Sequence, residues 1–180
     1  PGSYHAEYGF SCMGYEIAGG WGAKMADPSR EVFVMVGDGS YLLMNSDIYS
    51  SVLTGMKLIV VVCDNGGFLV IDRLQRAKGI PSFNNSIETC RTAVPAFRVD
   101  FAKHAEAMGA MGIRVGSMGE FDEAMDRALA ADRTVVIHVD VHPTDWSGND
   151  KSWWECGTPE VSARETVNAA RKDHEAGKKK

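Results

Sequence analysis

Residues 32–70 read VFVMVGDGSYLLMNSDIYSSVLTGMKLIVVVCDNGGFLV, and this stretch decides the fold. Its apolar runs at 32–36 and 58–63 are short and rich in β-branched residues, as in the central strands of a parallel sheet. Residues 42–54 between them have the length and polarity of a helix. A strand, a helix and a second strand form a right-handed crossover, which brings the carboxyl ends of both strands to one edge. We therefore expect an α/β fold with an open, mostly parallel sheet and helices on both faces.

Polar residues follow both predicted strands at this edge. Gly37, Asp38, Gly39 and Ser40 end the first run, and Asn65 ends the second, 27 positions after Asp38. Open α/β sheets bind ligands at the carboxyl edge, and the N–H groups of Gly39 and Ser40 at the helix start can hold a phosphate. A carboxylate beside a phosphate requires a cation between them, and Mg²⁺ binds through one or two protein oxygens plus phosphates. The pattern predicts a Mg²⁺-diphosphate site with Asp38 and Asn65 as ligands.

The rest of the chain predicts further elements around this unit. Small residues recur at helical spacing through 13–26, and such a glycine-rich helix is expected to pack closely on the sheet. The remaining patterns are a short helix at 70–75, a helix from Asp100 to about 108, a strand at 113–115, a helix at 120–131, a strand at 134–141 and a helix at 160–175. We expect a diphosphate- and Mg²⁺-binding domain over 1–145 and an aromatic segment with a helix over 146–180.

Two irregular stretches carry their own expectations. Residues 77–96 form a long loop with repeated Gly, Pro, Asn and Ser, and long loops in compact domains are usually functional or mobile. We interpret this loop as an active-site cover. Trp146, Trp153 and Trp154 lie in the second stretch, where they could form a core plug, a lid or an interface. We favour docking on the same chain or on a neighbouring subunit.

Composition limits the class of protein. The chain has 180 residues, 44% of them hydrophobic, and a net charge of −5, which argues against a nucleic-acid partner. No apolar run approaches the roughly 20 residues of a membrane span, and the N-terminus has no secretory signal pattern. The four cysteines are scattered without a CxxC pair, so we expect reduced thiols and a cytoplasmic location. The chain starts at Pro1, and we expect a fragment or one subunit of something larger.

Several histidines are candidates for chemistry. His5 lies in a loop and could transfer protons near neutral pH, with Glu7 as a weaker candidate; both could also be ordinary loop residues. His138, Asp140 and His142 alternate along a strand and share one face, as a metal cluster would require. We favour a simpler interpretation, in which this face is the polar side of an edge or partly exposed strand. His104 is expected on a helix surface.

The GDG turn followed by Asn65 at this spacing resembles the cofactor motif of the thiamine diphosphate (ThDP) enzyme superfamily. The resemblance implies a ThDP-binding fold, ThDP and Mg²⁺ as cofactors, and the backbone carbonyl of Gly67 as a third protein ligand. It also implies that Met13 supports the bent cofactor from below and that the backbone at 11–13 bonds the pyrimidine edge. The implied cofactor contacts are Ser11, Cys12, Met13, Gly37, Asp38, Gly39, Ser40, Asn65, Gly67 and Phe68.

Within this superfamily, the segments EYGFSCMGYEIAGGWGAKMA at 7–26 and SWWECGTPEVS at 152–162 are similar to the trihydroxycyclohexane-1,2-dione hydrolases of inositol catabolism. This similarity implies a ring-opening C–C hydrolase whose product is 5-deoxyglucuronate. The pair Asp72 and Arg73 and the loop at 77–95 depart from the expected pattern, and both lie where a substrate could be contacted.

The resemblance also implies that one essential group is absent from this chain. ThDP enzymes use a glutamate from an N-terminal (PYR) domain, usually of a second subunit, to activate the cofactor. We therefore expect a homo-oligomeric enzyme in which this chain alone is inactive. The alternatives are a small ThDP-binding subunit of a 2-oxoacid decarboxylase or oxidoreductase, and a phosphate-binding module without catalysis.

Overall fold

The computed structural model describes residues 4–7, 10–90, 97–145 and 157–178. They divide into two compact units, one of residues 1–65 with 98–141 and one of residues 66–97 with 142–180. We describe each unit by itself. The predicted domain boundary after residue 145 stays a prediction.

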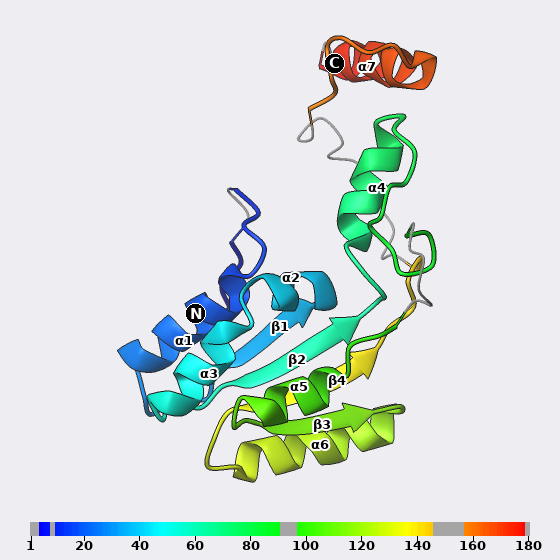
Figure 1. Ribbon diagram of the computed structural model, residues 1–180. Coiled ribbons are helices and arrows are strands. Elements are labelled where there is room, and N and C mark those ends of the chain that lie inside the picture. The colour runs from blue at the N-terminus through cyan, green and yellow to red at the C-terminus, as the bar shows by residue number, and fades with distance from the viewer. Residues whose placement is uncertain (1–3, 8–9, 91–96, 146–156, 179–180) are drawn as a thin grey trace. The chain divides into compact units, whose positions relative to one another are not determined.

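A four-stranded parallel sheet forms the centre of the first unit (Figure 1). Its strands, in chain order, are β1 (Phe33–Gly37), β2 (Ile59–Asp64), β3 (Met111–Val115) and β4 (Val135–Asp140). They lie in the order β1-β2-β4-β3, and every neighbouring pair is parallel. The predicted apolar strands and the open parallel sheet are thus confirmed.

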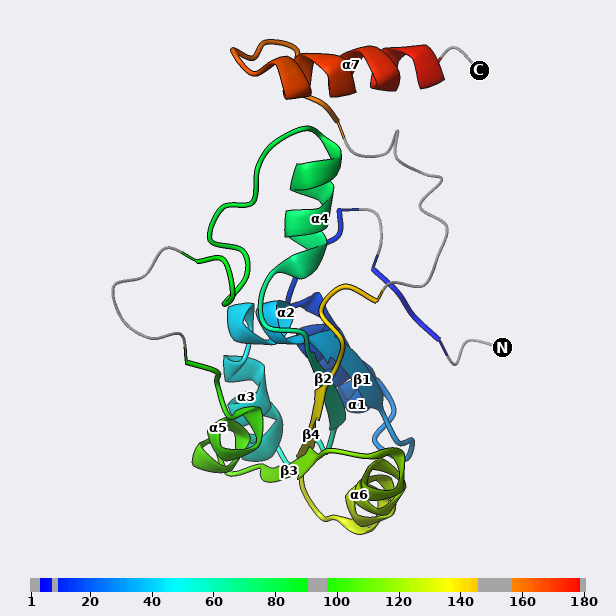
Figure 2. The same ribbon diagram turned by 90° about the vertical axis from the view of Figure 1, so that its right-hand side faces the viewer.

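Helices cover both faces of this sheet, as predicted. Figure 2 shows α3 (Ser46–Leu53) and α5 (Phe101–Ala107) on one side and α6 (Met118–Ala130) on the other. Successive strand residues point to opposite faces, so Val60 packs in the core on the α5 side while Ile59 packs in the core under α6. The two cores bury β2 on both faces, whereas Phe33 and Met35 of β1 are exposed on the face opposite Val34.

The helix α1 (Tyr15–Ala26) lies against β1 and contributes Ile17 to the core on the α5 side. Its glycines allow the close approach that the sequence predicted. A Cβ atom added to Gly20 would lie 2.4 Å from Cγ2 of Val34, which is closer than packed atoms approach. A small residue at position 20 is therefore required for this helix to rest on β1.

The single helix predicted over 42–54 is wrong, because the structure has two helices there. The first, α2 (Asp38–Leu43), begins at Asp38 itself, and α3 follows from Ser46. The Asn45 side chain between them donates to the carbonyl of Leu42 over 2.9 Å. Asparagine side chains compete in this way with helical backbone bonds, which accounts for the break.

Side chains cap two of the helix starts. Asp100 accepts a hydrogen bond from the backbone N–H of Lys103 at the start of α5. Ser117 accepts one from Glu120 N at the start of α6. Each cap satisfies a backbone donor that a helix start leaves without an intrahelical partner.

The second unit contains α4 (Leu69–Ala77) and α7 (Glu165–Gly177). The start of α7 lies on the turn after α4, where the Thr166 hydroxyl donates to the carbonyl of Gly79 over 2.6 Å. The loop after α4 turns back on the residues before it, because Phe68 N donates to the carbonyl of Asn85 over 2.7 Å. Trp146, Trp153 and Trp154 lie outside the described residues, as do loop residues 91–96.

Within the described ranges, none of the helices combines the length and the apolar character that crossing a membrane requires. Cys12, Cys63 and Cys90 are free thiols, as expected, and Cys156 lies outside these ranges.

Candidate functional site

Asp38 and Asn65 follow the carboxyl ends of two neighbouring strands, β1 and β2. Gly37 pairs with Cys63 in the β1–β2 register, so Asp38 and Asn65 are the residues that leave the ends of these neighbouring strands. Asp38 is only 5% exposed and is the first residue of α2. The pKa of the Cys63 thiol is raised by burial and, to a smaller extent, by the Asp38 carboxylate. A buried carboxylate therefore lies near the end of β2.

The side-chain oxygens of Asp38 and Asn65 are suitable ligands for a hard divalent cation. A carboxylate and an amide are oxygen ligands of the kind that Mg²⁺ takes, usually together with phosphate oxygens. Gly39 and Ser40 are buried in the first turn of α2, immediately after Asp38. The backbone at this turn can therefore approach a diphosphate. The ligand roles of Asp38 and Asn65 and the phosphate contacts of Gly39 and Ser40 stay predictions.

The loop before α1 has a defined conformation around Met13. The Glu7 carboxylate accepts hydrogen bonds from the backbone N–H groups of Phe10 (2.9 Å) and Cys12 (2.7 Å). Ser11 between them has a φ of 49°, a left-handed conformation that is uncommon for serine. Glu7, a proton-transfer candidate in the sequence, thus has a structural task here. Its two bonds shape the backbone that is predicted to face the pyrimidine.

His5 lies beside the first residue of α1. Its Nε2 atom is 3.0 Å from the hydroxyl of Tyr15, and the two rings are 5.6 Å apart. The sequence pointed to His5 but not to Tyr15, because the partner is ten residues away and no motif joins them. The catalytic role of His5 stays a prediction.

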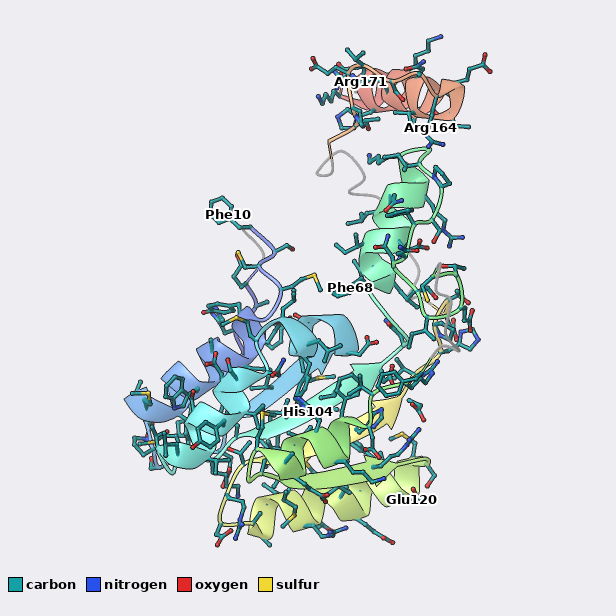
Figure 3. The ribbon with its side chains drawn as sticks, in the orientation of Figure 1. Phe10, Phe68, His104, Glu120, Arg164 and Arg171 are labelled. Carbon is teal, nitrogen blue, oxygen red and sulfur yellow. The ribbon has the colours of Figure 1, made fainter. Side chains whose placement is uncertain are left out.

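Gly67 and Phe68 begin the second unit. Gly67 has a φ of 146°, and a Cβ atom there would lie 2.3 Å from the carbonyl oxygen of Asn85. Glycine is therefore required where the loop turns back. Phe68 is the N-cap residue of α4 and is labelled in Figure 3. The metal contact of the Gly67 carbonyl and the cofactor contact of Phe68 stay predictions.

His138 and Asp140 meet Asp64, rather than His142, at the edge of the sheet. His138 Nε2 lies 3.2 Å from Asp64 Oδ2 and 3.6 Å from Asp140 Oδ1. One ligand atom from each of these three residues lies within 4.8 Å of the others, as a metal group would require. The expectation that their strand is at an edge or partly exposed is wrong for His138. Because β4 lies between β2 and β3, its side chain is 1% exposed.

Two arginines complete this group, and no motif in the sequence pointed to either. Arg114 Nη2 lies 2.7 Å from Asp140 Oδ2, while Arg98 Nη1 lies 3.5 Å from Asp64 and 3.8 Å from Asp140. Guanidinium groups already balance both carboxylates. These residues therefore form a network of ion pairs that connects the ends of β2, β3 and β4. Asp64 in this network directly precedes Asn65.

The His104 ring is half-buried, unlike the surface residue that was expected. It lies on α5 (Figure 3), and its Nδ1 atom is 3.1 Å from the hydroxyl of Tyr41. Tyr41 is fully buried in the core, and burial raises the pKa of its hydroxyl. The pair thus satisfies a phenol that would otherwise lack a partner within the core.

The ion pair between Arg114 and Asp140 predicts a measurable acid sensitivity. A hydrogen bond from Arg114 holds the pKa of the Asp140 carboxyl below its usual range. Its stabilisation is therefore complete above about pH 4 and is lost as the pH falls through the lowered pKa. In urea unfolding from pH 7 to pH 2, Asp140→Asn should lose less free energy of unfolding on acidification than the unchanged chain. Arg114→Gln should reduce the acid slope in the same way; an unchanged slope in both variants would contradict the assignment.

The chain is similar to known proteins over most of its length. Residues 1–139 match the family model described as thiamine pyrophosphate enzyme, C-terminal TPP binding domain. The chain is 39% identical over 173 residues to a 3D-(3,5/4)-trihydroxycyclohexane-1,2-dione hydrolase of Geobacillus thermodenitrificans, covering 93% of this chain and 27% of the relative. It is also 39% identical over 175 residues to such a hydrolase of Bacillus cereus, again covering 27% of the relative. The chain thus spans about a quarter of the curated relatives it matches.

Solved structures show the same fold. A ThDP-dependent 4-hydroxybenzoylformate decarboxylase of Rhodococcus jostii matches 72% of this chain and 23% of its own with a TM-score of 0.61 at 23% identity. A benzoylformate decarboxylase of Polynucleobacter necessarius matches 71% of this chain and 23% of its own with a TM-score of 0.55 at 22% identity. With the parallel sheet, the GDG turn and the family match, the chain belongs to the thiamine pyrophosphate enzymes and carries their C-terminal TPP-binding domain.

Proposed function

We propose that this chain is the cofactor-binding part of a ThDP-dependent hydrolase that opens the ring of 3D-(3,5/4)-trihydroxycyclohexane-1,2-dione to give 5-deoxyglucuronate in inositol catabolism. The observation that carries the proposal is the 39% identity to hydrolases of that name across 93% of the chain. The family model ends at residue 139, so this similarity also includes part of the segment that follows the TPP-binding domain.

The chain's own residues would hold and aim the cofactor. Asp38 and Asn65 would bind Mg²⁺, with the carbonyl of Gly67 as the third protein ligand. The backbone at Gly39 and Ser40 would bind the diphosphate. When bound, ThDP supplies a nucleophilic carbon and an electron sink for cleavage of a carbon–carbon bond beside a carbonyl. His5 lies on the loop that leads to Met13 and would move protons at the substrate.

The remaining parts of the enzyme would come from outside this chain. We propose that the activating glutamate belongs to an N-terminal PYR domain of a second subunit in a homo-oligomer. The free thiols of Cys12, Cys63 and Cys90 are consistent with a cytoplasmic enzyme, since thiols stay reduced there.

Turnover by two proteins tests this function. The full-length enzyme should convert the cyclic dione to 5-deoxyglucuronate only with both ThDP and Mg²⁺, whereas the 180-residue chain should show no turnover. Product would be followed by mass spectrometry, with pyruvate and benzoylformate as competing substrates. Release of CO₂ from a 2-oxoacid without opening of the dione would favour the decarboxylase alternative. Calorimetric titration should show that ThDP with Mg²⁺ binds the full-length enzyme and that ATP with Mg²⁺ does not; the reverse would favour a phosphate-binding module.

A further inference from the structure

Three residues join the Met13 loop to the turn that carries Asp38. The backbone N–H of Gly14 donates to Ser40 Oγ over 2.7 Å and to Glu16 Oε2 over 2.9 Å. The Ser40 hydroxyl in turn donates to the Glu16 carboxylate, with both oxygens 3.0 Å away. Glu16 is on α1 and Ser40 is on α2, so these bonds join segments that lie 24 to 26 residues apart.

The positions of these residues connect them to the proposed cofactor site. Gly14 directly follows Met13, and Ser40 is two residues after Asp38. Ser40 is 6% exposed and Gly14 is buried, so water competes little with the bonds between them. Hydrogen bonds to an ionised carboxylate are stronger than those between neutral groups. Movement of the Met13 loop away from the Asp38 turn would break these bonds.

Glycine is required at position 14. Gly14 has a φ of 93°, and a Cβ atom there would lie 2.2 Å from Cγ of Met44. Its N–H is thereby aimed at Ser40 and Glu16. The Ser40 hydroxyl is used within the protein, which leaves its backbone N–H, rather than its side chain, for the proposed diphosphate contact.

We propose that Glu16 and Ser40 are positioning residues of the cofactor site, which hold the loop under the cofactor's rings at a fixed place relative to the turn that binds its metal. This inference rests on the proposed function, because it concerns the same site. Two segments that are far apart in the sequence would bind the two ends of the cofactor. The bonds among Glu16, Ser40 and Gly14 set the distance between these segments. Neither residue needs to touch the cofactor through its side chain.

The test compares Glu16→Ala, Ser40→Ala and the double variant in the full-length enzyme. Groups that hold direct ligands in place typically contribute 10- to 100-fold in affinity or activity, so each single variant should weaken binding of ThDP with Mg²⁺ by about 10- to 100-fold. The double variant should be about as weak as either single one, because each change breaks the same network. At saturating cofactor, kcat of Glu16→Ala should stay within about threefold, as for a residue that acts on binding rather than on chemistry. Glu16→Gln keeps one acceptor oxygen and should restore most of the affinity.

Glu120→Ala is the matched control. Glu120 also lies in the first turn of a helix and accepts a hydrogen bond from a glycine N–H, that of Gly116 over 2.7 Å. It lies on α6 (Figure 3), outside the Glu16–Ser40–Gly14 network. Its loss should lower the melting temperature about as much as Glu16→Ala does and leave cofactor affinity unchanged.

The outcomes separate this inference from the proposed function. Asp38→Ala is measured alongside. If the unchanged enzyme does not bind ThDP with Mg²⁺, both the function and this inference fail. If binding occurs and depends on Asp38, but Glu16→Ala and Ser40→Ala bind as well as the unchanged enzyme, only the positioning role is overturned. Additive losses in the double variant, or an equal loss in Glu120→Ala, would also overturn it. Should Glu16→Ala be too unstable to purify, Glu16→Met removes both acceptor oxygens at a similar side-chain volume and supplies the same comparison.

Discussion

Replacement of Asp38 by alanine is expected to remove Mg²⁺-dependent binding of ThDP and to lower kcat/KM of the full-length enzyme by at least about 10³-fold. Asp38 is 5% exposed and directly follows β1, the strand next to the one that leads to Asn65. Loss of groups that merely orient a metal ligand costs about 10- to 100-fold, so loss of the proposed ligand itself should cost more.

Calorimetry with ThDP, titrated with and without Mg²⁺, measures the effect directly. Asp132→Ala is a suitable control, because this aspartate is 80% exposed and pairs only with its neighbour Arg133 among the contacts that the structure describes. Asp38→Asn keeps the shape of the side chain and should retain part of the metal affinity. Metal-dependent binding that survives Asp38→Ala would show that the metal ligand lies elsewhere.

Among the variants proposed here, replacement of Gly112 by alanine should lower the free energy of unfolding the most. Gly112 lies in β3, where a Cβ atom would be 2.1 Å from the carbonyl oxygen of Ala102 and 2.9 Å from its Cα. The colliding atoms are the backbone of α5, so no side chain can turn away to make room. Overpacking in a core typically costs 1 to 3 kcal/mol, and we expect roughly 3 kcal/mol or more here because the backbone itself must move. Urea unfolding followed by far-ultraviolet circular dichroism measures the change.

Gly119→Ala is the natural comparison. Gly119 lies in the first turn of α6, and a Cβ atom there would meet nothing within 4 Å. Alanine favours a helix over glycine by up to about 1 kcal/mol, so this variant should be as stable as the unchanged chain or slightly more. Equal stability of the two variants would mean that α5 does not rest on β3 as the structure shows.

Local patterns predicted most of the elements of the sheet unit. The runs that became β1 and β2 were legible because both are short, apolar and rich in β-branched residues, although β1 lies at the edge of the described sheet and leaves Phe33 and Met35 exposed. Asp100 marked the start of a helix because a cap depends only on the following turn. The two-helix segment at 38–53 was missed in part, since its break depends on the side chain of a single residue, Asn45, and the apolar pattern continues across it.

The candidate site likewise contains residues that the sequence predicted and residues that it did not. Asp38 and Asn65 could be placed at one edge because the carboxyl ends of strands joined by a right-handed crossover must meet there. The partners of His138 could not be predicted. Asp64 lies 74 residues away, and Arg114 reaches Asp140 from β3 across the strand interface. The register between strands decides which residues pair across them. The periodicity within one strand carries no information about that register.

The sequence by itself determined the family, the parallel sheet and the residues proposed to bind the metal, because each depends on order and spacing along the chain. Only the tertiary structure decided which charges meet and which segments are tied together. Most of these contacts join residues 24 or more positions apart, as between Asp64 and His138 or between Glu16 and Ser40. The pairs His138–Asp140 and Gly14–Glu16 are each only two positions apart. Packing of α1 and α2 and the order β2-β4-β3 bring these groups within hydrogen-bonding distance, and no pattern along a single segment encodes that approach.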